Sequence, residues 1–132
     1  MDGTQGVTVL SFANVMIPKE IHGQRYISLA TYRKSGVAVP TPIWFVEADG
    51  LLYVMTRGDS GKCKRVRNNP RVSFAPCTMR GRVTGPEFPG TARILPETDW
   101  EGIRALLRKK YWLMRVPFFW SSKNVFVEIP VR

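Results

Sequence analysis

The chain has 132 residues, 44% of them hydrophobic, and a formal net charge of +10 at pH 7. These values fit one folded domain with a real core and exclude wholesale disorder. No apolar run reaches the roughly 18 residues that a membrane-spanning helix needs, and the N-terminus lacks the basic start of a secretory signal. We therefore expect one cytoplasmic domain over residues 1–132 that meets an anionic partner, with residues 1–23 as a poorly determined N-terminal segment.

The first predicted elements are two strands joined by a turn at residues 34–36. Residues 25–32 (RYISLATY) alternate in the way that is typical of a strand. Residues 37–47 predict a second strand, irregular at Pro40 and Pro42. These prolines remove two ladder donors on the same side, which predicts an edge strand or a bulge.

A hairpin and a short helix are predicted next. Asp49 and Gly50 form a strong hairpin signal, and residues 51–56 continue it as a third strand. Residues 60–68 then follow a helical pattern, which either Asp59 or Ser60 can cap.

Three more strands are predicted at residues 71–76, 87–95 and 124–129. The second of them carries a bend at Pro89 and Gly90. Residues 97–110 predict the longer helix, with Thr98 as its cap and Glu101 at the capping-box position. Because no long crossover helix follows each strand, this order excludes a doubly wound parallel sheet and predicts a small, mostly antiparallel barrel with two helices.

The turn at residues 56–62 (TRGDSGK) has some features of a phosphate-binding loop. It lacks the first glycine of that motif and the Ser or Thr after its lysine, which excludes a P-loop nucleoside triphosphatase. A helix start that carries Ser60, Gly61 and Lys62 can still hold an anion, because its backbone N–H groups point outward. The alternative is that Ser60 only caps the helix and that Lys62 is solvated. The spacing favours neither.

No catalytic residue is assigned. The sequence contains no nucleophile–base pair, no paired carboxylates and no residues spaced as metal ligands, and His22 is expected at the surface. Any demanding chemistry would therefore belong to a bound cofactor. Cys63 and Cys77 are predicted to be buried thiols, with a disulfide as the alternative.

Aromatic residues have two interpretations. Trp44 either fills the core, which is the default, or stacks on a planar ligand. A dense aromatic group lies at residues 112–120, and we expect it to form a dimer interface or to line a pocket.

Several segments together resemble the pyridoxamine 5'-phosphate oxidase-like split-barrel family over residues 24–130. They are YISLAT, PTPIWFV, SGK, NPRVSFAPC and EFPGTARIL. The chain is most similar to the branch that uses the deazaflavin coenzyme F-420. The resemblance implies a mainly β fold with two or three short helices, a six-stranded antiparallel split β-barrel, and a homodimer whose cofactor lies between the subunits.

The resemblance also implies a cofactor site. Ser60 and Lys62 would bind the cofactor phosphate, and Arg65 would reach the phosphate or the cofactor tail. Thr41 and Pro42 would lie along the ring system. The full set of predicted cofactor-binding residues is Thr41, Pro42, Trp44, Thr56, Ser60, Gly61, Lys62 and Arg65.

The deazaflavin is the cofactor that we expect, and FMN is the alternative. The deazaflavin carries a phosphodiester and an anionic oligoglutamate tail, which match the charge of +10. Strand 51–56 (LLYVMT) is apolar and lacks the additional basic residues that often accompany tightly bound FMN.

The first functional hypothesis is a reductase that passes a hydride to a small-molecule electron acceptor such as a quinone, an enone or a tetrapyrrole. The second is a protein that binds or carries a flavin, a deazaflavin or haem without turnover. Charge alone suggests a third, a nucleic-acid-binding module. It is disfavoured because most aromatic residues fall in apolar runs, away from the basic residues.

Overall fold

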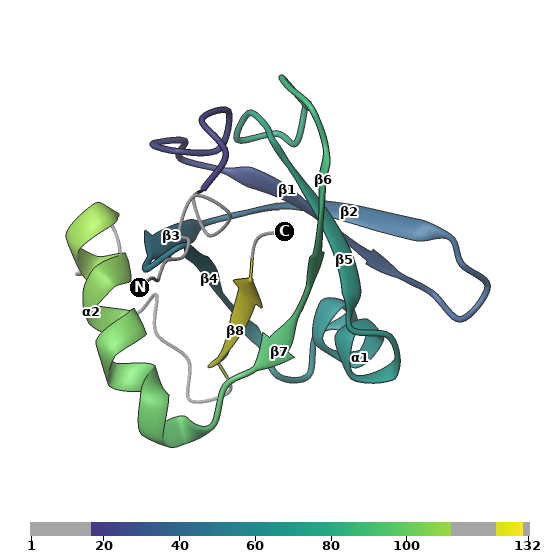
Figure 1. The fold of residues 1–132 in the computed structure, drawn as a ribbon. Helices are drawn as coiled ribbons and strands as arrows, with labels where there is room; N and C mark the ends of the chain where they lie inside the picture. Colours follow the sequence, from purple (N-terminus) through teal and green to yellow (C-terminus); the bar gives the residue numbers. More distant parts are fainter. Residues whose placement is uncertain (1–16, 112–123, 131–132) are drawn as a thin grey trace, which may run out of the picture.

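The computed structural model describes residues 17–111 and 124–130 (Figure 1). Within these ranges the chain forms two α-helices, one 3-10 helix and eight strands. The strands are β1 (Ile27–Tyr32), β2 (Ala38–Ile43), β3 (Phe45–Ala48), β4 (Leu51–Arg57), β5 (Arg71–Pro76), β6 (Phe88–Thr91), β7 (Arg93–Ile94) and β8 (Asn124–Pro130). The helices are α1 (Gly61–Asn68), the 3-10 helix η3 (Glu97–Asp99) and α2 (Trp100–Lys110). The predicted mainly β class is confirmed, and the aromatic group at residues 112–120 lies outside the described residues.

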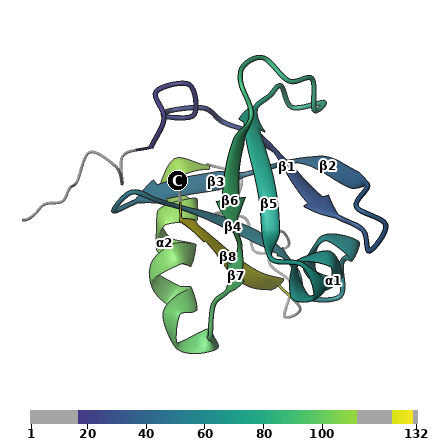
Figure 2. The same cartoon turned by 45° about the vertical axis from the view of Figure 1, so that its right-hand side comes forward.

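The strands make two antiparallel four-stranded sheets that enclose a common core, as a split barrel does. Their orders are β2-β1-β5-β6 and β3-β4-β8-β7. Figures 1 and 2 show α1 at the end of β4 and α2 against the second sheet. None of the helices in the described ranges is long and apolar enough to cross a membrane.

The expected count of six strands is wrong, because two predicted strands are each shared between the sheets. Residues 37–47 divide at Trp44 into β2 and β3, and residues 87–95 divide at Ala92 into β6 and β7. The alternation of side chains continues across both points, so the sequence pattern does not reveal the change of sheet.

The bend predicted at Pro89 and Gly90 is also wrong. Both residues lie inside β6, where they pair with Ser73 and Val72 of β5. The chain instead leaves the first sheet at Ala92, whose N–H donates to the Pro70 carbonyl at 2.8 Å.

Local turn signals are confirmed. Asp49 and Gly50 have φ values of 53° and 77°, as a hairpin turn with two positive φ angles requires. Pro40 and Pro42 lie in β2, which is an edge strand of the first sheet, so their missing N–H groups cost no ladder bond there. Cys63 and Cys77 are both buried and free, as predicted.

The second helix begins differently from the prediction. Residues 97–99 form the 3-10 helix, α2 starts at Trp100, and no side chain caps either helix. Thr98 lies inside the 3-10 turn rather than before a helix, so the predicted cap is wrong. The start of α2 is fixed instead by the Trp100 indole, whose Nε1 donates to the Leu95 carbonyl at 2.9 Å.

Two clusters of apolar side chains stabilise this arrangement. One fills the barrel and includes the fully buried residues Phe45, Phe74 and Ile129. The other lies between α2 and the second sheet and includes Leu107 and Phe126. Adjacent residues of β4 therefore face different clusters, so the two faces of this strand contribute to different parts of the candidate site.

Candidate functional site

Ser60 organises the start of α1. Its backbone is extended (φ −74°, ψ 159°), and its Oγ accepts a hydrogen bond from the Cys63 N–H at 3.2 Å. Thr56, at the end of β4, places its Oγ1 3.2 Å from the same oxygen. Asp59 instead pairs with Arg57 at 3.0 Å. Of the two predicted caps, Ser60 is therefore the one that acts, and two hydroxyl groups lie beside the open N–H groups of the helix.

Arg65 crosses from α1 to the barrel. Its Nε donates to Thr31 Oγ1 at 2.7 Å, and Thr31 is fully buried in β1. A Cβ at Gly61 would lie 2.8 Å from Arg65 Nη1. The guanidinium therefore lies directly over the helix start, and glycine leaves the space that it uses.

Lys62 is a half-buried cation beside this guanidinium. Burial, and then the charge of Arg65, lower the pKa of its ammonium. No carboxylate in the part of the chain that the structure describes forms an ion pair with Lys62 or Arg65. A bound anion would neutralise both cations and accept from the hydroxyl of Ser60, so the donors present fit a phosphate group.

Strand pairing extends this site along β1 and β2. Thr41 pairs with Leu29, while Val39 pairs with Thr31 and Ile43 pairs with Ile27. Alternate residues of a strand share a face. Thr41 therefore lies between the Arg65 anchor on Thr31 and the other end of the strand pair.

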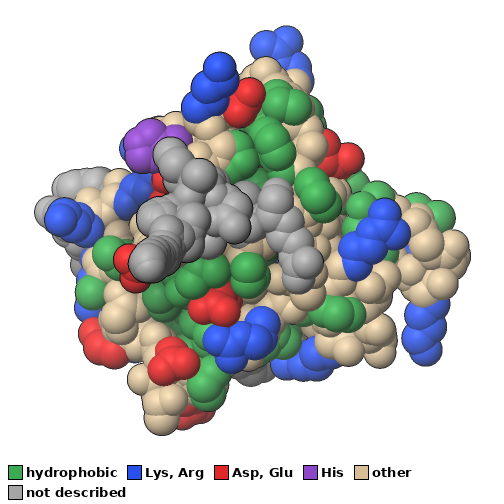
Figure 3. Space-filling model, in the orientation of Figure 1, with side chains coloured by type: hydrophobic (Ala, Val, Ile, Leu, Met, Phe, Trp, Pro, Cys, Tyr) green, Lys and Arg blue, Asp and Glu red, His purple; other side chains and the backbone are tan. Residues whose placement is uncertain are grey.

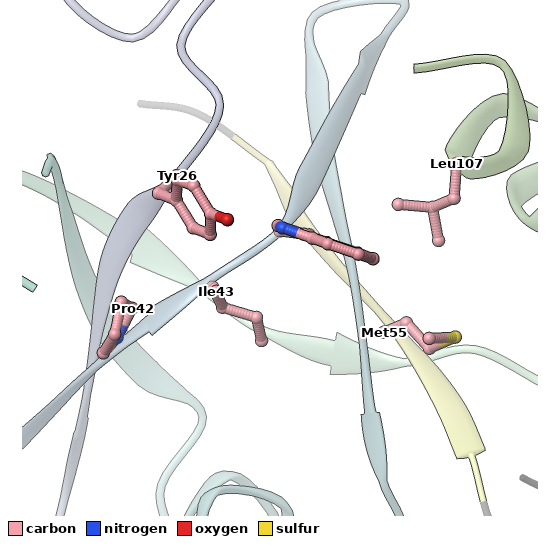
Figure 4. A pocket seen from close by; sticks show the side chains of 6 residues that line it. Tyr26, Pro42, Ile43, Met55 and Leu107 are labelled. Atoms are coloured by element: carbon pink, nitrogen blue, oxygen red, sulfur yellow. The ribbon is translucent and has the colours of Figure 1, made fainter. Parts of the chain in front are cut away.

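A cavity of about 280 Å³ lies at that other end, where β2 passes into β3. It is lined by Tyr26, Pro42, Ile43, Trp44, Met55 and Leu107. Figure 4 shows the labelled side chains around this space, coming from β2, β4, α2 and the residue before β1. The lining is mostly apolar, as in sites for planar organic ligands.

Trp44 packs against a neighbouring aromatic ring in this cavity. Its ring stacks on Tyr111 with centroids 4.6 Å apart and an interplanar angle of 10°. Trp44 thus packs on Tyr111 and also lines the cavity, and its stacking on a planar ligand stays a prediction.

The predicted residues fall into two groups rather than one. Thr56, Ser60, Gly61, Lys62 and Arg65 gather at the start of α1. The cavity holds Pro42 and Trp44, and Thr41 lies between the groups. Thr31 and Ile27 are four residue steps apart along β1, which is about 14 Å.

Several neighbours of the site were missed by the sequence analysis. Thr31 holds Arg65, but its place in an alternating strand gives no sign of that contact. Tyr26, Met55 and Leu107 line the cavity, although each one fits an ordinary strand or helix pattern. These contacts join segments that are distant in sequence, so no local signal could have found them.

The charge does not form one stripe on the face seen in Figure 3. Basic side chains are scattered over that face, both at its edge and within it, and acidic side chains lie among them. A nucleic-acid groove would need a continuous basic surface with exposed stacking aromatics.

Comparison with models of known protein families shows to which family the chain belongs. The family model described as pyridoxamine 5'-phosphate oxidase matches residues 17–121. The chain belongs to the pyridoxamine 5'-phosphate oxidase family. The resemblance seen in the sequence is thus confirmed at the level of the family. No curated protein matches the chain.

Solved structures share the split-barrel fold of this family member. The Mycobacterium tuberculosis protein Rv2991 matches with a TM-score of 0.68 at 22% identity, over 94% of this chain and 86% of that one. HutZ, a heme storage protein from Vibrio cholerae, has a TM-score of 0.68 at 13% identity over 83% of each chain. A FAD-binding protein from Mesorhizobium loti has a TM-score of 0.60 at 24% identity, over 86% of this chain and 84% of that one. At these identities the likeness shows the fold alone.

Proposed function

We propose that the chain is an oxidoreductase that binds the phosphorylated deazaflavin coenzyme F-420 and passes a hydride to a small unsaturated acceptor. The observation that carries the proposal is the pair of cations at the start of α1. Lys62 and Arg65 lie together, and no described carboxylate balances them. Such a pair beside open helix N–H groups is suited to a phosphate.

The rest of the coenzyme would extend along the β1–β2 pair. Thr41 lies on the path, and the apolar cavity with Trp44 and Pro42 lies about 14 Å from the Arg65 anchor. That separation suits a ligand with a phosphate at one end and a planar ring at the other. In this arrangement Ser60, Lys62 and Arg65 bind, while Trp44 and its neighbours orient the ring and exclude water.

The bound deazaflavin supplies the hydride chemistry, and the protein supplies position and electrostatics. The net charge of +10 supports a polyanionic coenzyme over FMN. The position of Arg80 and Arg82, on either side of Gly81, also supports a polyanionic coenzyme. A Cβ at Gly81 would lie 3.4 Å from the Pro42 ring, so these basic residues are near one end of the path. FMN remains the alternative cofactor.

We also propose that the protein acts as a homodimer, as the family resemblance implies. Two chains of 15.0 kDa would then sediment as one species. Analytical ultracentrifugation checks this, and a species of one chain at working concentration would contradict it.

The alternative function is binding without turnover, with a flavin, deazaflavin or haem as the cargo. The name of HutZ as a heme storage protein favours testing haem. Against haem in the Trp44 cavity, the one histidine of the chain is engaged elsewhere, since His22 Nδ1 lies 2.7 Å from Glu47 Oε1.

Oxidation of reduced deazaflavin by menadione, cyclohexenone or biliverdin separates these functions. We expect acceptor-dependent loss of the absorbance of the reduced coenzyme with the wild-type protein. At subsaturating coenzyme, Lys62→Met should be slower by at least about tenfold, the loss of one charge-assisted contact. Tight binding without oxidation of any acceptor would favour the carrier, and no binding would overturn the proposal.

A further inference from the structure

A second cavity lies beside β3 and the end of α2. Its volume is about 380 Å³, within the usual range for small-molecule sites. It is lined by His22, Gly23, Val46, Glu47, Leu106, Lys109 and Lys110. These residues come from the turn before β1, from β3 and from the last turns of α2.

The single carboxylate of this cavity is already engaged. Glu47 Oε1 lies 2.7 Å from His22 Nδ1, and Oε2 accepts from the Gly23 N–H at 2.9 Å. The carboxylate is thus held toward the turn, where two donors offset its charge. It forms no ion pair with either lysine of the cavity.

Lys110 is a half-buried cation that forms no ion pair with any carboxylate of the described residues. Its Nζ donates to the Phe45 carbonyl at 2.9 Å and lies 3.6 Å from the Phe45 ring centroid. Burial lowers the pKa of this ammonium to about 8, while Glu47 raises it and Arg25 lowers it. Lys109, exposed at the rim, also forms no ion pair in the described part of the chain.

Apolar side chains complete the cavity. Val46 is buried on β3, and Leu106 is half-buried on α2. A ligand that suits these walls has an apolar body, and a ligand that suits Lys110 has a negative charge. We propose that this cavity binds a small organic acid, with its carboxylate on the Lys110 ammonium and its apolar body against Val46 and Leu106.

This site is independent of the proposed function. Tyr111 lies between the two cavities, since its ring stacks on Trp44 and also lies 5.2 Å from Lys110 Nζ. An acid bound at Lys110 would therefore not need the cations at the start of α1.

Binding of an anion would stabilise the protonated form of Lys110. Affinity should therefore fall as pH rises above about 8, by up to about tenfold per pH unit. The other charged or titratable groups facing Lys110 are Glu47 and His22, with Arg25, Lys109 and Tyr111. Burial raises the pKa of the Tyr111 phenol, so this group stays neutral over the range in which Lys110 titrates.

The test is amide-resolved NMR titration with benzoate and with benzamide, which is nearly the same shape but neutral. We expect benzoate to shift the amides of Gly23, Val46 and Leu106, with at least about fivefold higher affinity than benzamide. That ratio is the lower end of a charge-assisted contact. Affinity for benzoate should fall above pH 8 in the wild-type protein, a readout that does not depend on the folding of any variant.

Lys110→Met keeps most of the apolar stem and should remove the preference for benzoate. Lys64→Met, on the exposed face of α1, is the matched control and should leave it unchanged. Equal affinities for benzoate and benzamide, no shifts with either compound, or shifts centred on Tyr26 and Met55 would overturn the proposal. An unchanged benzoate preference in Lys110→Met would overturn it as well.

Discussion

Tyr111 joins α2 to the open edge of β3 through one hydroxyl group. Its oxygen accepts from the Phe45 N–H at 2.9 Å and lies 2.8 Å from the carbonyl oxygens of Arg25 and Phe45. β3 is an edge strand of its sheet, so this N–H has no strand partner on that side. Tyr111 and Phe45 are both fully buried, so water cannot replace the hydroxyl.

Tyr111→Phe removes this hydroxyl and keeps the ring that stacks on Trp44. It leaves the buried Phe45 N–H without an acceptor, at a cost of about 1–2 kcal/mol. The carbonyls of Arg25 and Phe45 also lose the one hydrogen bond that the hydroxyl can donate, which adds about 1 kcal/mol. The cost is no larger because the Phe45 carbonyl still accepts from the Lys110 ammonium. We expect the free energy of unfolding to fall by about 2–3 kcal/mol.

Urea unfolding followed by far-ultraviolet circular dichroism measures this loss. Tyr26→Phe is the matched control, since the Tyr26 hydroxyl has no hydrogen bond in the described part of the chain, and it should change stability by less than about 0.5 kcal/mol. A loss in Tyr111→Phe as small as that of the control would refute the reasoning. It would mean that the Phe45 N–H finds water or another acceptor.

Three further predictions concern stability and are measured by the same unfolding assay. Gly90→Ala should cost about 1–3 kcal/mol, because the new Cβ would lie 2.8 Å from Ile129 Cγ2 in the core; a neutral result would mean that the core has room there. Ser60→Ala removes the cap that accepts from the Cys63 N–H and should cost about 1 kcal/mol, whereas an unchanged stability would deny the cap. The pKa of Lys110 is lowered from 10.5 to about 8, so the unfolded state binds more protons between these values and stability should rise with pH there. For a half-exposed ammonium this rise is about 1 kcal/mol after solvent screening, and it should be absent in Lys110→Met; an equal rise in both proteins would assign it to another group.

Local signals predicted most of the fold. The alternation at residues 25–32, the turn at Asp49 and Gly50, and the capped helix start at Ser60 each depend on residues that are close in sequence. The two changes of sheet, at Trp44 and Ala92, were missed because the strand pattern continues through them. They are set by packing of the two sheets on a common core.

The candidate site likewise has one part that the local sequence predicted and another part that it did not. The start of α1 was predicted, since Ser60 and Lys62 are neighbours in the chain. The hydrogen bond from Arg65 to Thr31 and the cavity beside Trp44 were not, since they join elements far apart in sequence. The lowered pKa of Lys110 depends on burial against Phe45, which no sequence pattern around residue 110 reveals.

The most direct test of the central claim, an anion site at the start of α1, is a fluorescence titration with the oxidised deazaflavin coenzyme. It compares the wild-type protein with Lys62→Met and with Lys64→Met, an exposed lysine on the same helix. We expect micromolar binding to the wild type, a loss of about 1.5–3 kcal/mol in Lys62→Met and a change of less than about twofold in Lys64→Met. Equal affinities in all three proteins, or equal losses in the two variants, would contradict the assignment of the phosphate to Lys62.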